Sequence, residues 1–335
     1  MLPAILGLSG PTLTDAERGL IRDAEPAGLC LFRRNVVDPA QLRALTDSLR
    51  DLSGRADLPI LIDQEGGRVA RLGPPHWPAF PAAARFASLY EKAPMSAIEA
   101  ARANGQALAL MLAEAGINVD AAPVLDLLHP GADAIVGDRS FGTEPMQVAA
   151  LGRALLDGLA AGGVAGIIKH MPGHGRAAAD SHHQLPVVDA SAEELVADLA
   201  PFRALAGRAP MAMTAHILYP AWDAELPATL SPVIIAEVIR GAIGFEGLLM
   251  TDDIAMNALS GSVAERARAA LAAGCDVVLH CSGEPADNEM LASALGPMNE
   301  AAAARLARAV ALRPAETAMT GAALMAKRDA LLALA

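Results

Sequence analysis

This sequence has fewer basic than acidic residues, and this shortage of positive charge excludes some classes of partner. Against 38 Asp and Glu there are only 26 Lys and Arg, which gives a formal net charge of −12 over 335 residues. Nucleic acids and anionic membrane surfaces both require a basic face. We therefore expect neither as a partner. The chain is nevertheless 53% hydrophobic and 19% charged, so it can bury a large core and is not expected to be disordered.

Cysteine is nearly absent. The three present, Cys30, Cys275 and Cys281, lie in or beside apolar runs and form no CxxC motif. An odd number of thiols in such surroundings favours buried, reduced cysteines of a cytosolic protein over a disulfide framework.

Long apolar runs are also missing. None approaches the roughly 18 uncharged residues that a membrane span requires, and the first ten residues have no basic segment followed by the apolar stretch of a signal peptide. We expect a cytoplasmic protein that acts as a monomer.

What the chain does contain is a regular alternation. About eight short apolar runs are separated by stretches with helical periodicity. The runs are 3–8, 28–32, 59–63, 118–124, 164–169, 210–216, 247–252 and 276–280, and the helical stretches are 14–24, 39–52, 96–115, 146–161, 192–206, 232–242 and 262–273.

Such alternation produces a parallel sheet with right-handed crossovers, and eight repeats favour closure into a (β/α)₈ TIM-type barrel. No G-x-G-x-x-G motif follows the first run, which weakens a dinucleotide-binding alternative. We expect one α/β domain over residues 1–335, with a helical tail from about 299, interrupted at Pro314, that packs outside the barrel.

Polar residues follow most of these apolar runs, where a parallel barrel places its active site. They include Asp63, Asp126, Lys169, His170, His216, Asp252, Asp253 and His280. A single such residue can be a helix cap, as Asp253 could be for the helix that follows. A rim with so many of them predicts an active site instead.

Two groups of these residues suggest chemistry. Asp252 ends the run 247–252, where a carboxylate can serve as a nucleophile, a metal ligand or a cap. Asp180 and His182 are two residues apart, so in an extended segment their side chains point the same way. The carboxylate could then orient the imidazole and stabilise its protonated form, which makes His182 a candidate general acid/base.

A third group would bind ligand. Asp63, Arg71, Arg139 and Lys169 should converge on one bowl, where mixed charges suit a polyhydroxylated ligand. A structural ion-pair network at the rim is the alternative. Trp77 and Trp222 could stack on a sugar, although aromatic residues are only 3% of the chain, and packing in the core or a loop accounts for them equally well.

Two other functions compete with this interpretation. A metal-dependent hydrolase could draw its ligands from His170, His174, Asp180, His182, His183, His216 and Asp252. However, no H-E-x-x-H motif is present, and Lys169 would place a cation among the ligands. A sugar-binding protein without catalysis would keep Asp63, Arg71 and Lys169 but would have no use for Asp252 or the Asp180–His182 pair. We expect neither a metal nor another cofactor.

Taken together, the motifs resemble the bacterial β-N-acetylglucosaminidases of glycoside hydrolase family 3, in their short form used in cell-wall recycling. The matching segments run in family order from about residue 28 to 281. They are 31–35 (LFRRN), 62–69 (IDQEGGRV), 118–126 (NV…APVLD), 137–142 (GDRSFG), 169–175 (KHMPGHG), 180–182 (DSH), 215–216 (AH), 227–231 (PATLS) and 251–256 (TDDIAM).

The resemblance implies that Asp252 is the nucleophile and that His182 is the general acid/base, on a mobile loop and partnered by Asp180. It also implies that Asp63, Arg71, Arg139, Lys169 and His170 bind N-acetylglucosamine. The expected substrates are muropeptide fragments, N-acetylglucosaminyl-1,6-anhydro-N-acetylmuramic acid and its peptides, cleaved with retention through a covalent glycosyl-enzyme.

The sequence departs from the family pattern around the loop that carries His182. Met171 stands where phenylalanine is usual, and Arg176 and Ala177 replace a common acidic and hydroxyl pair. Every residue with an assigned chemical role is present, so these changes bear on how the loop is positioned rather than on the reaction.

Overall fold

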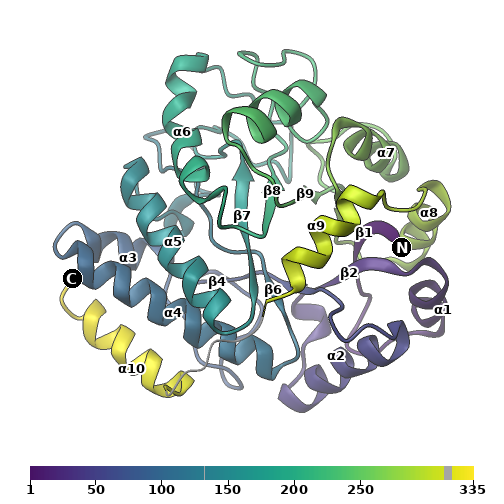
Figure 1. Ribbon diagram of the computed structural model, residues 1–335, viewed down its shortest axis with the longest axis horizontal. Coiled ribbons are helices and arrows are strands. Elements are labelled where there is room, and N and C mark those ends of the chain that lie inside the picture. Colours follow the sequence, from purple (N-terminus) through teal and green to yellow (C-terminus); the bar gives the residue numbers. More distant parts are fainter. Residues whose placement is uncertain (132, 313–318) are drawn as a thin grey trace.

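Eight parallel strands close into a barrel in this computed structural model, which describes residues 1–131, 133–312 and 319–335 (Figure 1). Around the barrel the order is β1-β10-β9-β8-β7-β6-β3-β2. The strands are β1 (Leu2–Gly7), β2 (Pro26–Leu31), β3 (Ile60–Ile62), β6 (Val119–Asp120), β7 (Ala165–Met171), β8 (Met211–Thr214), β9 (Leu248–Asp253) and β10 (Val277–His280). The predicted (β/α)₈ barrel is confirmed.

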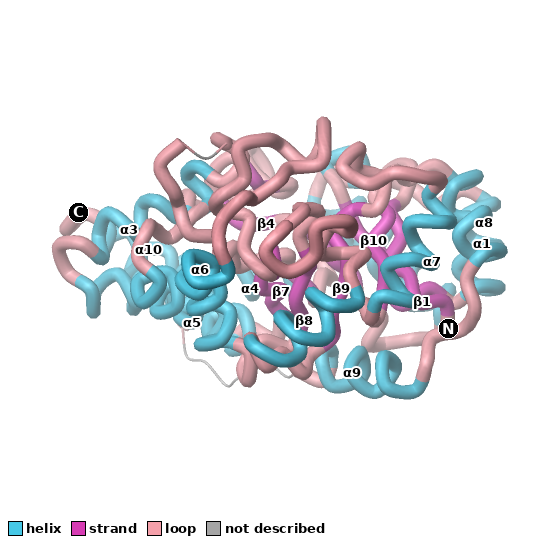
Figure 2. Tube along the Cα trace, turned by 90° about the horizontal axis from the view of Figure 1, so that it is seen from above, coloured by secondary structure: helices cyan, strands magenta, loops and turns pink. Residues whose placement is uncertain are grey.

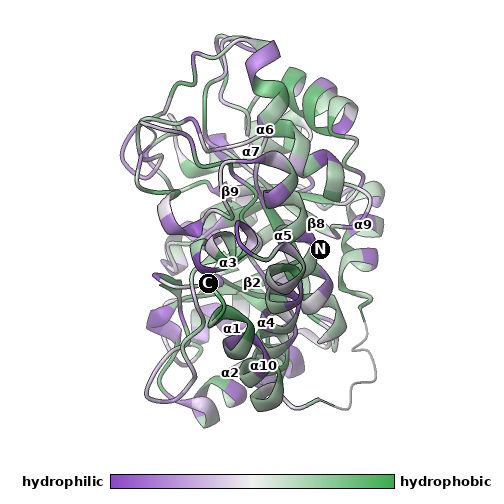
Figure 3. Cartoon of the chain, turned by 90° about the vertical axis from the view of Figure 1, so that its left-hand side faces the viewer, coloured by the Kyte–Doolittle hydropathy of each residue, from purple (hydrophilic) through white to green (hydrophobic). Residues whose placement is uncertain are grey.

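Helices follow the strands and cover the outside of the barrel. They are α1 (Asp15–Ala24), α2 (Pro39–Ser53), α3 (Ala83–Tyr90), α4 (Pro94–Glu114), α5 (Pro145–Ala161), α6 (Ala192–Leu205), the π-helix η3 (Ile234–Ala242), α7 (Val263–Ala273) and α8 (Pro285–Ala294). Figure 3 shows hydrophobic and hydrophilic residues on the same helices, as expected for helices with one face on a core and one in water.

Local sequence explains where several helices begin. Thr14, Ser191 and Ser262 each accept a hydrogen bond from the backbone N–H three residues later, and the glutamate at that position bonds back to the cap. Two helices pack unusually closely because of a glycine: a Cβ on Gly105 of α4 would lie 2.4 Å from the carbonyl oxygen of Leu155 in α5.

The strands are apolar on both faces, because one face meets the helices and the other fills the barrel. The interior cluster includes Ile5, Cys30, Leu61, Val119, Ile167, Met211 and Val277, all nearly inaccessible to solvent. The predicted strand 118–124 is cut to Val119–Asp120. Pro123 has no N–H to donate to a ladder, and beyond β6 only an isolated bridge joins Val124 to Lys169.

The chain after residue 299 forms α9 (Glu300–Val310) and α10 (Gly321–Leu332). Leu306 and Ala309 of α9 belong to the interior cluster, so this helix closes the amino-terminal end of the barrel. α10 packs against α4 (Figure 1). Pro314, the predicted interruption, lies outside the described residues.

Seen from above, loops gather on one side of the barrel and α9 lies on the other (Figure 2). Those loops include elements that the sequence patterns did not predict, the hairpin β4 (Gln64–Gly66) and β5 (Val69–Ala70) and the 3₁₀ turns η1 (Arg33–Asn35) and η2 (Gly137–Arg139). Among the described helices, none has the length and apolar character that crossing a bilayer demands.

A buried carboxylate fastens α9 to the barrel and yields a stability prediction. Asp276 accepts hydrogen bonds from Arg240 at 2.8 Å, Arg305 of α9 at 2.9 Å and the backbone N–H of Leu249 at 2.8 Å. Asp276→Ala leaves these donors unpaired, so we expect a loss of about 3 kcal/mol in the free energy of unfolding measured in urea.

The exposed pair between Arg43 and Asp47, at 2.9 Å, provides the control. Arg43→Gln should cost less than about 1 kcal/mol, because water screens exposed ion pairs. Equal losses for the two variants would contradict a special role for Asp276.

Candidate active site

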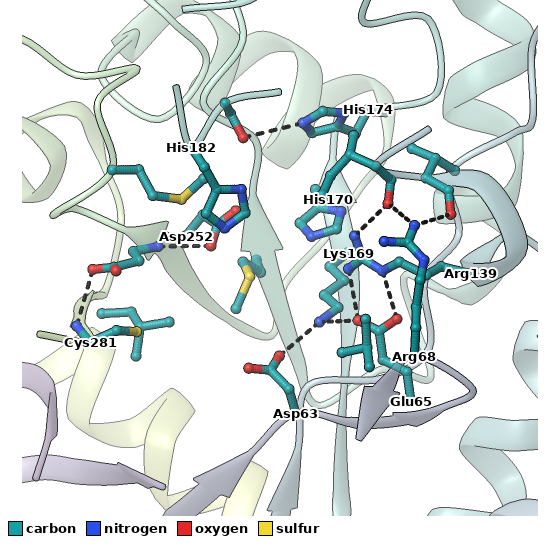
Figure 4. Close-up of a pocket in the computed structure, with 18 of the residues that line it drawn as sticks. Asp63, Glu65, Arg68, Arg139, Lys169, His170, His174, His182, Asp252 and Cys281 are labelled. Carbon is teal, nitrogen blue, oxygen red and sulfur yellow. Dashed lines mark hydrogen bonds and ion pairs between the residues drawn. The ribbon is translucent and has the colours of Figure 1, made fainter. Parts of the chain in front are cut away.

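A cavity of about 270 Å³ opens at the carboxyl ends of the strands, on the side of the barrel where the loops gather. Seven of the eight predicted site residues line it: Asp63, Arg71, Arg139, Lys169, His170, His182 and Asp252. The eighth, Asp180, reaches the cavity through its contact with His182. Figure 4 shows the side chain of Lys169 beside those of Asp63 and Glu65, with Asp252 on the opposite side of the cavity.

The central feature of this cavity is a buried ammonium group between carboxylates. Lys169 projects from β7, and its Nζ lies 3.0 Å from Asp63 Oδ1 and 2.7 Å from Glu65 Oε1. Arg139, from η2, binds the same glutamate with two hydrogen bonds of 2.7 and 2.8 Å. Arg71 lies 2.9 Å from the other oxygen of Asp63.

These contacts favour the charged forms of Asp63, Glu65 and Lys169. Burial raises the pKa of Glu65, but Lys169 and Arg139 outweigh it and lower that pKa to about 2. The pKa of Asp63 is also lowered, because Lys169 and Arg71 overcome the effect of burial. Burial acts to lower the pKa of Lys169, yet its two carboxylates raise it. A ligand therefore meets fixed charges of both signs.

Glu65 was missed as a site residue from the sequence, although it lies in the matched segment IDQEGGRV. The feature of the sequence that could have indicated Glu65 is the polar stretch after the third apolar run, in which it lies. The β4–β5 hairpin folds that stretch back over the barrel, and Gln64 holds it there by accepting hydrogen bonds from the backbone of Arg71 and Leu72, both at 2.9 Å.

A second buried carboxylate, Asp126, supports the neighbouring loop. Its oxygens accept hydrogen bonds from the backbone N–H groups of His170, at 3.2 Å, and His174, at 2.7 Å, and one lies 2.7 Å from His170 Nδ1. Burial raises its pKa, but His170 and these hydrogen bonds lower it to about 2. Asp126 thus orients the imidazole of His170 at the cavity wall.

Asp252 lies near the end of β9 and faces the cavity. One of its carboxylate oxygens accepts a hydrogen bond of 2.8 Å from the N–H of Asp253. Burial acts to raise the pKa of Asp252, but the opposing effect of His170 and His216 is larger, so the pKa is lowered overall. The carboxylate is therefore ionised across the neutral range, as a nucleophile must be.

The position of Asp253 in the sequence allowed it to cap the helix that follows, but it does not do so in the structure. Ser262 is the cap of α7. Asp253 instead accepts hydrogen bonds from the backbone of Ala255, at 3.0 Å, and Cys281, at 3.1 Å. Through these two bonds it holds the loop that joins β9 to α7 against the end of β10.

His182 lies on the loop after β7 and is oriented by Asp180. Its Nδ1 is 2.7 Å from Asp180 Oδ1, and its backbone N–H donates to the same oxygen at 2.8 Å. Burial acts to raise the pKa of Asp180, but these hydrogen bonds from His182 lower it. With 59% of its side chain exposed, His182 has contact with solvent and with the cavity.

Other candidates from the sequence lie elsewhere. Trp77 lines a different cavity and packs against His76 with ring centroids 5.9 Å apart, and Trp222 packs on Tyr219 with ring centroids 5.4 Å apart. His216 does not line the cavity but is buried beside Asp252, with its ring nitrogens 2.7 Å from Thr229 Oγ1 and 3.0 Å from the carbonyl oxygen of Asp253. Within the described parts of the chain, no three histidine, cysteine or acidic side chains form a set that could hold a metal ion.

Comparison with known proteins agrees with this arrangement. Residues 5–311 match the glycosyl hydrolase family 3 N-terminal domain. A β-hexosaminidase of Alkalilimnicola ehrlichii is 43% identical over 284 residues, which cover 84% of this chain and 80% of that protein. One from Thiobacillus denitrificans is 40% identical over 311 residues, covering 91% and 85%.

Solved structures extend the similarity to the whole fold. NagZ from Neisseria gonorrhoeae, in complex with N-trifluoroacetyl-D-glucosamine, superposes with a TM-score of 0.86 at 35% identity, covering 99% of this chain and 96% of that one. A family 3 β-N-acetylglucosaminidase from Paenibacillus gives a TM-score of 0.87 at 32% identity, covering 98% and 66%. The chain therefore belongs to glycosyl hydrolase family 3, as a β-N-acetylhexosaminidase.

Proposed function

We propose that this hydrolase removes terminal β-linked N-acetylglucosamine from peptidoglycan fragments by a retaining double displacement. The observation that carries the proposal is the cavity that Asp252 and His182 share with the Lys169 cluster. An ionised carboxylate, an imidazole oriented by a carboxylate and fixed charges for sugar hydroxyls are the parts that such a reaction needs.

In the first step Asp252 attacks the anomeric carbon. The bond to the aglycone breaks, and His182 donates a proton to the departing oxygen. Asp180 stabilises the protonated imidazole before that transfer. The product is a glycosyl ester of Asp252, and the aglycone leaves as a neutral alcohol.

In the second step water attacks the same carbon. His182 now accepts the proton of that water, and the ester bond to Asp252 breaks, which restores the carboxylate. Two displacements at one carbon return the β configuration. This chain departs from the usual pair of carboxylic acids in such a scheme, because the Asp180–His182 pair takes the place of the second one.

Substrate choice follows from the size and charge of the cavity. A volume of about 270 Å³ is at the small end of ligand pockets and suits one sugar ring. Asp63, Lys169, Arg71 and Arg139 present acceptors and donors to its hydroxyls. The N. gonorrhoeae structure contains an N-acylated glucosamine, which supports N-acetylglucosamine here. The muropeptide aglycone rests on the family resemblance.

The direct test is product analysis. Incubation with N-acetylglucosaminyl-1,6-anhydro-N-acetylmuramic acid, followed by NMR, should show N-acetylglucosamine released first as the β anomer. Initial release of the α anomer would contradict a double displacement, and an uncleaved disaccharide would contradict the substrate.

Replacing the nucleophile provides a second prediction. Asp252→Asn should lower kcat/KM on the order of 10⁴-fold or more, because no covalent intermediate can form. A slow 5-fluoro glycosyl fluoride should add one sugar to Asp252 of the unaltered enzyme, as read by mass spectrometry of its peptides. Circular dichroism of the variant serves as the folding control, and an adduct on another residue would remove Asp252 from this role.

Replacing the acid/base provides a third. His182→Ala should lower kcat/KM roughly 10²–10⁴-fold for a disaccharide, the usual contribution of proton transfer. The loss should be much smaller for a 4-nitrophenyl glycoside, since nitrophenolate departs without a proton. Equal losses on the two substrates would rule out His182 as the acid.

A further inference from the structure

The loop that carries His182 leaves β7 through a tightly held stem, residues 173–177. A Cβ on Gly175 would lie 1.8 Å from the carbonyl oxygen of Leu127, so this backbone lies directly on the neighbouring loop. Tyr219 Oη donates to the carbonyl oxygen of Gly173 at 2.7 Å, and the N–H of Asp133 donates to that of Ala177 at 2.9 Å.

Arg176 is the side chain that fastens this stem to α6. Its Nε lies 2.7 Å from Asp198 Oδ2, and its Nη2 donates to the carbonyl oxygen of Glu194 at 3.2 Å. Asp198 is only 2% exposed, and its other oxygen lies 2.8 Å from His129 Nε2. One buried carboxylate thus joins the stem, α6 and the loop after β6.

The tip of the same loop is held less firmly. The carbonyl oxygen of Ser181 accepts a hydrogen bond of 3.2 Å from the N–H of Ala258. Its Oγ lies 3.4 Å from His174 Nε2, near the limit of a hydrogen bond. The exposed His182 follows directly, so where its imidazole lies depends on how the stem directs the loop.

We propose that Arg176 is a positioning residue, which places His182 for proton transfer by pairing with Asp198. The inference rests on the acid/base role proposed for His182. Arg176 is suited to this because a guanidinium can bond a carboxylate and a carbonyl at once.

The test uses Arg176→Gln and two substrates. We expect kcat/KM for a disaccharide to fall roughly 10-fold, because small displacements of a catalytic group are costly. For the 4-nitrophenyl glycoside the fall should be under about 3-fold, since that leaving group does not need the acid. Arg176→Lys, which retains one ion pair, should recover part of the loss.

Arg208→Gln is the matched control. It removes another arginine–aspartate pair of 2.7 Å, with Asp157, outside the cavity-lining set. Its kinetics should equal those of the unaltered enzyme on both substrates. Thermal unfolding of each variant separates a loss of stability from a loss of position.

A double variant shows whether Arg176 acts through His182. In the His182→Ala background, Arg176→Gln should cause no further loss on the disaccharide, because the group it positions is gone. A full additional 10-fold loss there, or equal losses on the two substrates in the single variant, would overturn the proposal and leave Arg176 a structural residue.

The two proposals fail in different ways. If His182→Ala alone shows no dependence on the leaving group, the assignment of His182 fails and the role of Arg176 fails with it. If His182→Ala behaves as expected while Arg176→Gln matches Arg208→Gln, only the role of Arg176 is wrong.

Discussion

The buried ammonium of Lys169 is the interaction on which the site depends. Among the described residues, it is the one group in the cavity that pairs with both carboxylates: without it, Asp63 would keep only Arg71 and Glu65 only Arg139, and the pKa values of both acids would rise. With it, the β4–β5 hairpin, the η2 turn and β7 meet at one point through short ion pairs. Breaking such a buried network costs several kcal/mol, so the cluster that we propose to bind the sugar also organises the rim.

Much of the fold could be predicted because the strands are buried on both faces. Each of the eight apolar runs overlaps a barrel strand, and each of the seven helical stretches overlaps a helix. α3 and the β4–β5 hairpin escaped prediction, since a two-residue strand such as Val69–Ala70 has no periodicity to detect. The strand before Pro123 is shorter than predicted because proline has no backbone N–H to donate to the neighbouring strand. The apolar pattern of the sequence does not register this missing donor.

The sequence indicated which residues line the site better than it indicated which of them contact one another. Position at strand ends indicated Asp63, Lys169 and Asp252, and spacing indicated the Asp180–His182 pair. Nothing in the sequence paired Glu65 with Arg139, 74 residues apart, because that contact needs the hairpin to fold over the barrel. Asp126 was visible at a strand end, but its bonds to the backbone of His170 and His174 depend on how the next loop turns.

The helix α9 has an electrical consequence beyond packing. By placing Leu306 and Ala309 under the strands, it adds buried apolar side chains to the interior cluster beneath Lys169. Such a medium polarises weakly, so it does little to weaken the field of the charges above it, and field lines concentrate toward the open mouth. A hydroxyl dipole entering from that side is aligned more strongly than it would be over a hydrated base.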